Sequence, residues 1–138
     1  IEDHFASIAL IDYNPLTRKT QLSTSGINPV LVYKAKTDEV SQLSKQNEPL
    51  GVEKTSVFED ITVQLQSGDI LVSCTDGLLE SLSESGVQYS AARLMQVIKT
   101  NHELSGADIA ERVKADVQLH SGTAQQYDDQ SLLVIKIK

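Results

Sequence analysis

The sequence has no tryptophan, a single cysteine and few aromatic residues, which together make up 4% of the chain. Because Cys74 is that single cysteine, no disulfide bond can form within the chain, and nothing signals secretion. Its place in an apolar run predicts a small buried hydrophobic residue rather than a nucleophile. The sequence also shows no signal peptide and no run of about 18 apolar residues, so it predicts no membrane-spanning segment. With so few large rings, we expect a core built mostly from Leu, Ile, Val and Ala.

Basic residues are also scarce, because 12 Lys and Arg stand against 19 Asp and Glu, for a net charge of -7. Nucleic acids and anionic membranes bind basic surfaces, so this balance argues against both as partners. A length of 138 residues suits one domain, and 40% hydrophobic residues suffice for its core. We therefore predict a single unit over residues 1–138. Because the first residue is Ile1 rather than Met, we expect this unit to be part of a longer protein.

Most of the chain has the pattern of β-strands joined by short connections. Residues 60–65 alternate apolar and polar side chains, as a half-buried strand does. Asn14 and Pro15 predict a tight turn that would join the first two strands in a hairpin. Repeated hairpins favour antiparallel sheets. We expect strands over residues 5–13, 19–25, 29–35, 40–43, 60–65, 70–75 and 130–138.

Two helices are expected in the second half of the chain. The first covers residues 90–101, where apolar side chains recur at helical spacing. The second begins at Ser105, a good N-cap, and Asp108 three residues later completes a weak capping box. Residues 120–129 have the composition of a loop. The apolar positions of the two helices are Leu94, Val97, Ile98, Ile109, Val113 and Val117.

Acidic residues lie where two of the predicted strands end or begin. Asp76 follows the strand that ends at Thr75, and Asp128 and Asp129 precede the last strand. If these strands are antiparallel neighbours, the end of one lies beside the start of the other, and the carboxylates converge. Converging carboxylates repel unless a proton or a cation lies between them, and Mg²⁺ and Mn²⁺ prefer oxygen ligands. The pattern therefore has two interpretations, a metal site or ordinary turns, since Asp-Gly is a common turn pair.

The other candidate residues are weaker. His4, His102 and His120 lack a metal-ligand spacing such as His-x-x-x-His, so we expect them on the surface or at helix ends. Ser73 does not lie in a nucleophile elbow, and the sequence has neither a Walker A loop nor a Gly-x-Gly-x-x-Gly loop.

Four segments of the sequence, taken in order, resemble the motifs of one protein family. They are FASIALIDYNPLTRKTQLSTSGINPVLVYK, EPLGV, SGDILVSCTDGLLES and YDDQSLLVIKI. They look like a first hairpin, a Pro-Leu-Gly loop, a block of Gly-Asp, strand and Thr-Asp-Gly, and a closing Asp-Asp strand. In this order they resemble the C-terminal part of bacterial metal-dependent protein serine/threonine phosphatases, the stage II sporulation protein E-like branch of the type 2C (PPM) family. Each segment is a weak signal, but four in order along nearly the whole chain are a strong one.

The resemblance implies an α+β fold, an antiparallel β-sandwich flanked by helices, here incomplete at the N-terminus. It implies that Asp76 and Asp128 are metal ligands, with the neighbouring Asp129 as a further candidate. In the family, two Mn²⁺ or Mg²⁺ ions hold a water that attacks the phosphorus of phosphoserine or phosphothreonine. The implied partner is therefore a phosphoprotein, such as an anti-sigma-factor antagonist, and the implied location is the cytoplasm.

The sequence also departs from the family pattern. The family begins with a segment that carries a Gly-Asp metal motif and a second Asp-Gly-rich motif, and neither is in this chain. Ser25-Gly26-Ile27 stands where the family often has Ala-Gly-His. The alternative to a phosphatase is thus a non-catalytic adaptor or sensor module with the same fold. The retained Asp76 and Asp128 favour the phosphatase.

The missing segment has consequences for the isolated chain. Two strand ends supply few carboxylates, so we expect weak Mn²⁺ binding and little or no phosphatase turnover by this chain alone. A sandwich without its first strands leaves a sheet surface or edge uncovered, so we also expect self-association, for example as a homodimer.

Overall fold

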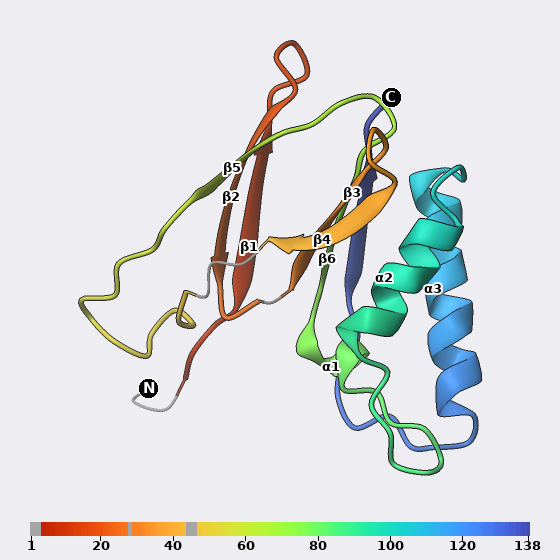
Figure 1. Cartoon of the computed structure of the whole chain (residues 1–138). Helices are drawn as coiled ribbons and strands as arrows, with labels where there is room; N and C mark the ends of the chain where they lie inside the picture. The colour runs from red at the N-terminus through yellow and green to blue at the C-terminus, as the bar shows by residue number, and fades with distance from the viewer. Residues whose placement is uncertain (1–3, 28, 44–46) are drawn as a thin grey trace.

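The computed structural model describes residues 4–27, 29–43 and 47–138, and these residues form three layers (Figure 1). Two antiparallel β-sheets pack against each other, and helices cover the outer face of one of them. The prediction of an antiparallel β-sandwich with helices outside is confirmed. The three-stranded sheet has the order β1-β2-β5, with β1 (Ile8–Tyr13), β2 (Lys19–Ser25) and β5 (Ile61–Gln64). The four-stranded sheet has the order β4-β3-β6-β7, with β4 (Glu39–Leu43), β3 (Val30–Lys34), β6 (Ile70–Cys74) and β7 (Leu132–Lys136).

The elements agree with the predicted ones except at a few places. The predicted first hairpin is present, and its turn is held by the Asn14 side chain, whose Oδ1 accepts hydrogen bonds from the backbone N–H groups of Leu16 and Thr17. The predicted loop over residues 120–129 is wrong at its start, because the last helix continues through Ser121. Ile1, on which the prediction of a longer protein rests, lies outside the described residues. The helices are α1 (Asp76–Leu79), which was not predicted, α2 (Ala91–Thr100) and α3 (Gly106–Ser121).

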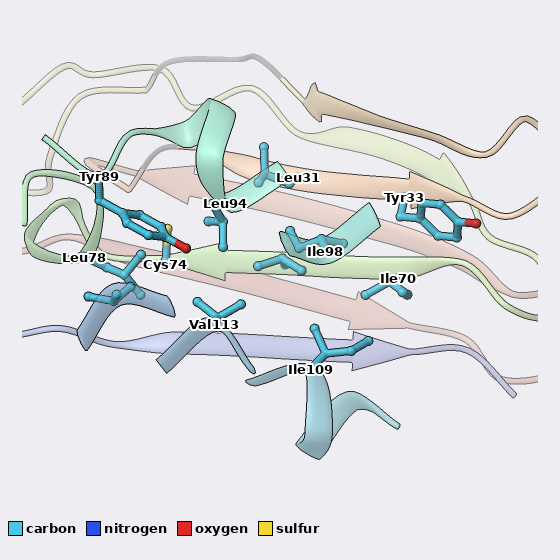
Figure 2. Close-up of a cluster of buried hydrophobic side chains, with 12 residues drawn as sticks. Leu31, Tyr33, Ile70, Cys74, Leu78, Tyr89, Leu94, Ile98, Ile109 and Val113 are labelled. Atoms are coloured by element: carbon cyan, nitrogen blue, oxygen red, sulfur yellow. The ribbon is translucent and has the colours of Figure 1, made fainter. Parts of the chain in front are cut away.

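The central strands of the four-stranded sheet, β3 and β6, are buried on both faces, which explains the nearly continuous apolar run of β6. Successive residues of a strand point to opposite faces. Ile70 and Val72 of β6 therefore pack under the helices (Figure 2), whereas Leu71 packs toward the three-stranded sheet, where it joins Leu22 of β2. The helical face predicted from spacing is confirmed in this core. Its buried members on the helices are Leu94, Ile98, Ile109, Val113 and Val117.

Leu, Ile and Val make up most of the core, as expected, but the predicted contribution of alanine is wrong. No alanine of the described residues is buried, and two tyrosines are, Tyr33 and Tyr89. Their hydroxyl groups are not left without partners. Tyr33 donates to Asp38 at 3.1 Å, and Tyr89 donates to Asp116 of α3 at 2.7 Å. A buried tyrosine is tolerated because its ring adds apolar area while its hydroxyl keeps a hydrogen bond.

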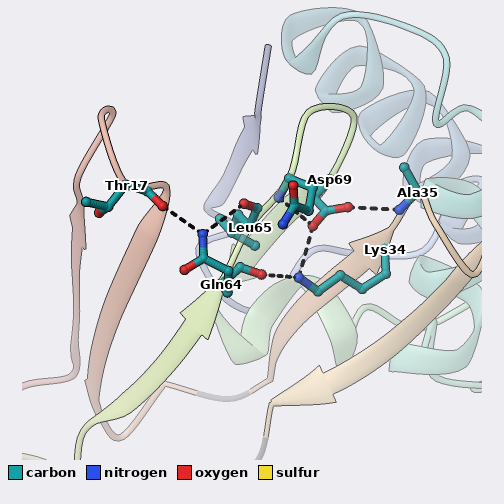
Figure 3. Close-up of polar contacts among 7 residues, drawn as sticks. Thr17, Lys34, Ala35, Gln64, Leu65 and Asp69 are labelled. Atoms are coloured by element: carbon teal, nitrogen blue, oxygen red, sulfur yellow. Dashed lines mark hydrogen bonds and ion pairs between the residues drawn. The ribbon is translucent and has the colours of Figure 1, made fainter.

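A buried carboxylate joins the end of β3 to the connection between β5 and β6. Asp69 is only 1% exposed and accepts hydrogen bonds from the backbone N–H groups of Ala35 and Gln66, both at 2.9 Å. It also pairs with the ammonium group of Lys34, which in turn donates to the carbonyl of Gln64 (Figure 3). Because its oxygens have several donors, Asp69 fixes the end of β3 relative to the turn that precedes β6.

The other face of the three-stranded sheet has little cover in the described part of the chain. On β1, Leu10 is 59% exposed and Ile8 is 39% exposed. α2 and α3 lie beyond the four-stranded sheet and do not reach this face (Figure 1). The expected self-association through an uncovered sheet stays a prediction. Among the described residues, no helix has both the length and the apolar character that a membrane crossing requires.

The start of α3 gives a first testable prediction. Ser105 Oγ accepts a hydrogen bond from the backbone N–H of Asp108 at 3.1 Å, as predicted for an N-cap. Ser105→Ala should lower the free energy of unfolding by about 1 kcal/mol, because it removes this acceptor. Ser105→Thr keeps the acceptor and should recover most of the loss. Urea denaturation of the three proteins measures both effects, and equal midpoints for Ser105→Ala and the unmodified chain would contradict the assignment.

Candidate metal centre

The predicted meeting of two strand ends is present in the structure. β6 and β7 are antiparallel neighbours, and Cys74 and Leu132 form the last residue pair of their register. Beyond that pair, the backbone N–H of Thr75 donates to the carbonyl of Ser131 at 3.1 Å. The chain therefore brings the segment that begins at Asp76 beside the segment that ends before Ser131.

Thr75 ties the two segments together through its side chain as well. Its hydroxyl accepts a hydrogen bond from the backbone N–H of Ser131 at 2.9 Å. The same hydroxyl donates to the carbonyl oxygen of Asp129 at 3.4 Å. Thr75 was not among the predicted site residues. The only signal for it was its place in the Thr-Asp-Gly block, since the partner of its hydroxyl lies more than fifty residues away in the chain.

Gly77 is the residue at which the two segments touch most closely. A Cβ atom added there would lie 2.3 Å from the carbonyl oxygen of Asp129 and 3.1 Å from Cβ of Asp128. Only a residue without a side chain allows this approach. Asp76 and Gly77 begin the short helix α1. The glycine is needed because another backbone lies against it.

The three acidic side chains at this edge of the sheet are exposed. Asp76, Asp128 and Asp129 are all solvent-exposed, and no Lys or Arg among the described residues forms an ion pair with them. One oxygen of Asp128 is already used, because its Oδ1 accepts from the backbone N–H of Asp129 at 2.8 Å. Gln126 donates to the carbonyl of Asp128 at 2.8 Å and steadies the same turn.

The donors at this edge suit a hard cation but are few. Carboxylate oxygens are the ligands that Mg²⁺ and Mn²⁺ prefer, and the contact at Gly77 holds the two acidic segments together. Within the described residues, no group of three or more His, Cys, Asp or Glu side chains is arranged to hold a metal ion. The structure thus agrees with part of a metal site. The metal-binding roles of Asp76, Asp128 and Asp129 stay a prediction.

The histidines lie away from this edge or make other contacts. His102 stacks on the ring of Tyr33, with 4.9 Å between ring centroids, and His120 contacts Arg93 and the carbonyl of Val87. His120 lies in the last turn of α3, as expected for a residue at a helix end. These contacts give the two side chains structural roles.

Cys74 lies directly before the candidate centre but is not suited to act as a nucleophile. It is buried, with 3% of its surface exposed, as the sequence predicted. Burial, and to a smaller extent the charge of Asp76, raises the pKa of its thiol to about 11. At neutral pH the thiol is therefore protonated, and the reactive thiolate is scarce.

The fold matches that of known phosphatase domains. The SiaA-PP2C domain of Pseudomonas aeruginosa has a TM-score of 0.83 and 19% sequence identity, over 96% of this chain and 52% of that one. The Mn-presoaked phosphatase domain of SpoIIE from Bacillus subtilis has a TM-score of 0.72 and 19% identity, over 95% and 56%. The serine/threonine phosphatase PstP/Ppp of Mycobacterium tuberculosis has a TM-score of 0.66 and 14% identity, over 99% and 62%.

At these identities the solved structures establish the fold alone, and the chain spans about half the length of the first two. No curated protein matches the sequence. The family model described as stage II sporulation protein E matches residues 1–138, the whole of the chain. The chain therefore belongs to the stage II sporulation protein E (SpoIIE) family of PP2C-type phosphatase domains.

Proposed function

We propose that the chain is part of a metal-dependent protein serine/threonine phosphatase domain, in which Asp76, Asp128 and Asp129 supply ligands to Mn²⁺ or Mg²⁺. The observation that carries the proposal is the close contact at Gly77, where the end of β6 and the start of β7 meet with their acidic residues exposed. Family membership adds the type of reaction. Further ligands would have to come from outside the described residues.

The residues around the carboxylates have a positioning role in this proposal. The Thr75 hydroxyl and the close approach at Gly77 hold the acidic turn against α1. The bond from the N–H of Asp129 fixes one oxygen of Asp128 and leaves the other oxygen for a cation. When bound, the metal ions would supply charge stabilisation for the phosphoryl group and a water of lowered pKa. The protonated thiol of Cys74 gives no support to a reaction through a covalent enzyme intermediate.

The proposed substrate is a phosphoserine or phosphothreonine in a regulatory protein, such as an anti-sigma-factor antagonist, in the cytoplasm. Membership of the SpoIIE family supports this class of substrate. The acidic composition of the chain argues against a nucleic acid as its partner.

The alternative is a non-catalytic adaptor or sensor with the same fold. It is favoured by one observation, the lack of a complete set of metal ligands among the described residues. An adaptor would need the family fold but not the carboxylates.

Removal of the metal distinguishes the two functions. The full-length protein that carries this chain should release phosphate from a phosphoserine protein with Mn²⁺, and the release should stop when a chelator is added.

The isolated chain should bind Mn²⁺ only weakly, with a dissociation constant on the order of millimolar, because Mn²⁺ and Mg²⁺ give up little hydration to a site with few ligands. Titration calorimetry measures that binding. Absence of phosphate release with Mn²⁺ and with Mg²⁺, across several phosphoproteins, would favour the adaptor.

A further inference from the structure

A small cavity adjoins the candidate metal centre on the side of α1. It has a volume of about 250 Å³ and lies between α1, the segment after it and the turn that precedes β7. Gly77 and Asp128 line it, so it shares a wall with the acidic edge of the sheet. A group bound in this cavity would therefore lie next to the position of the reacting phosphate in the proposed function.

The size of the cavity limits what it can hold. Pockets for complete small molecules are about 300–1,000 Å³. A cavity of about 250 Å³ is smaller and fits one part of a larger partner, such as a side chain of a protein substrate.

The chemistry of the lining selects the kind of side chain. Glu80 and Asp128 are its two charged residues, and no Lys, Arg or His lines it. Asp128 is a metal ligand in the proposed function, so Glu80 supplies the charge that is left for a further ligand, and this charge favours a cation over an anion. Tyr127 is 78% exposed, so its ring can lie beside a cation, and the carboxamide of Gln88 can accept hydrogen bonds from it. A lysine or arginine side chain can pair with the negative charge, lie beside the ring and donate hydrogen bonds to the carboxamide.

The wall formed by the segment after α1 is held in place by α3 and the residues that follow it. Ser81, which lines the cavity, lies 2.9 Å from the hydroxyl of Ser121, and Gln130 donates to it at 3.3 Å. A few residues on, Glu84 accepts hydrogen bonds from the N–H of Thr123 at 2.9 Å and from its hydroxyl at 2.7 Å. Because these bonds cross between distant segments, the wall is formed before any partner binds.

From this geometry we propose that the cavity binds a lysine or arginine side chain of the phosphoprotein substrate, close in sequence to the phosphorylated residue. Glu80 supplies the opposite charge and Tyr127 the aromatic face. The inference rests on the proposed function, because the phosphorylated residue is placed at the adjoining metal centre. It names a specificity determinant of the substrate, a basic residue beside the phosphorylation site.

The test compares two phosphoserine peptides that differ only in having arginine or glutamate beside the phosphoserine. Fluorescence anisotropy with the Mn²⁺-loaded full-length protein measures the dissociation constants of the same peptides with a non-hydrolysable phosphonate in place of the phosphoserine phosphate, so that no turnover occurs. We expect the arginine peptide to bind about fivefold more tightly, the ratio expected for an exposed charge pair. Glu80→Gln should reduce the ratio to about twofold or less. Glu39→Gln, on the opposite edge strand β4, makes the same change in net charge and should leave the ratio unchanged.

Equal affinities for the two peptides would overturn the inference, and so would a Glu39→Gln variant that behaves like Glu80→Gln. Phosphate release is measured separately with the phosphoserine peptides. A protein that prefers the arginine peptide through Glu80 but releases no phosphate would support the cavity as a binding site and count against the phosphatase. A protein that releases phosphate from both peptides with no preference would support the phosphatase and count against the cavity as a binding site.

Discussion

Gly77→Ala should destabilise the fold by about 3 kcal/mol, at the upper end of the cost of placing an extra methyl group in a closely packed site. The added Cβ would lie 2.3 Å from the carbonyl oxygen of Asp129, a distance that side-chain carbons do not reach. That oxygen belongs to the backbone, so it cannot turn away as the end of a flexible side chain could. Either α1 or the turn at Asp128 must move, and both carry the candidate metal ligands. Urea denaturation measures the loss of stability.

A matched control is available in the same chain. Gly106→Ala adds the same methyl group at the start of α3, where its nearest neighbour outside the helix backbone would be 3.4 Å away. There we expect no loss, or a gain of up to about 1 kcal/mol from the better helix propensity of alanine. If Gly77→Ala unfolds at the same urea concentration as the unmodified chain, the two segments do not touch as described.

Asp69→Ala should lower the free energy of unfolding by about 3 kcal/mol, a loss similar to that expected for Gly77→Ala. The carboxylate accepts from the N–H groups of Ala35 and Gln66, and each of these loses a protein partner when the side chain is removed. A buried donor without an acceptor costs about 1–3 kcal/mol, and these two donors lie in exposed residues, so we expect about 1.5 kcal/mol for each. The ion pair with Lys34 adds little, because the lysine is about one-third exposed and solvent screens its charge.

Two further variants check this explanation of Asp69. Asp69→Asn keeps the shape and one oxygen acceptor but brings an NH₂ group that cannot accept, so its loss should be intermediate. Asp12→Ala removes an exposed carboxylate from β1 and should change stability by less than about 0.5 kcal/mol. Equal denaturation midpoints for Asp69→Ala and Asp12→Ala would mean that the buried carboxylate does not hold the end of β3 against the turn that precedes β6.

Features encoded locally in the sequence were predictable. β2 was expected over residues 19–25 and lies at Lys19–Ser25, because the Asn14-Pro15 turn predicts that the next segment pairs back as the second arm of a hairpin. Ser105 caps α3 as expected, since a cap depends on residues within one turn. The order of the motifs was specific enough to indicate the family.

Features that depend on distant contacts could not be predicted. α1 is a helix of four residues, too short to show a helical period, and its position is determined by the contact of Gly77 with the turn before β7. Tyr89 can be buried because its hydroxyl donates a hydrogen bond to Asp116, which lies 27 residues further along the chain. The cavity beside Glu80 is likewise formed by segments that are separate in sequence.

The candidate site was predictable only up to its acidic residues. The sequence places Asp76 at a strand end and Asp128 before a strand start, but their convergence depended on an assumption, that the two strands are neighbours. The register of β6 and β7 confirms that assumption. The role of Thr75 in joining the two segments became apparent only from the structure, because its hydroxyl accepts a hydrogen bond from the backbone N–H of Ser131.

The most direct test of the metal centre is phosphate release from a phosphoserine protein by the full-length protein with Mn²⁺, with and without Asp76→Asn. The amide has nearly the shape of the carboxylate, so the variant should fold normally, but it lacks the negative charge that binds the cation. We predict Mn²⁺-dependent release by the unmodified protein and its loss in Asp76→Asn, whereas Asp12→Asn, on the exposed face of β1, should keep full activity. Full activity of the Asp76→Asn variant would contradict the proposed role of this edge of the sheet.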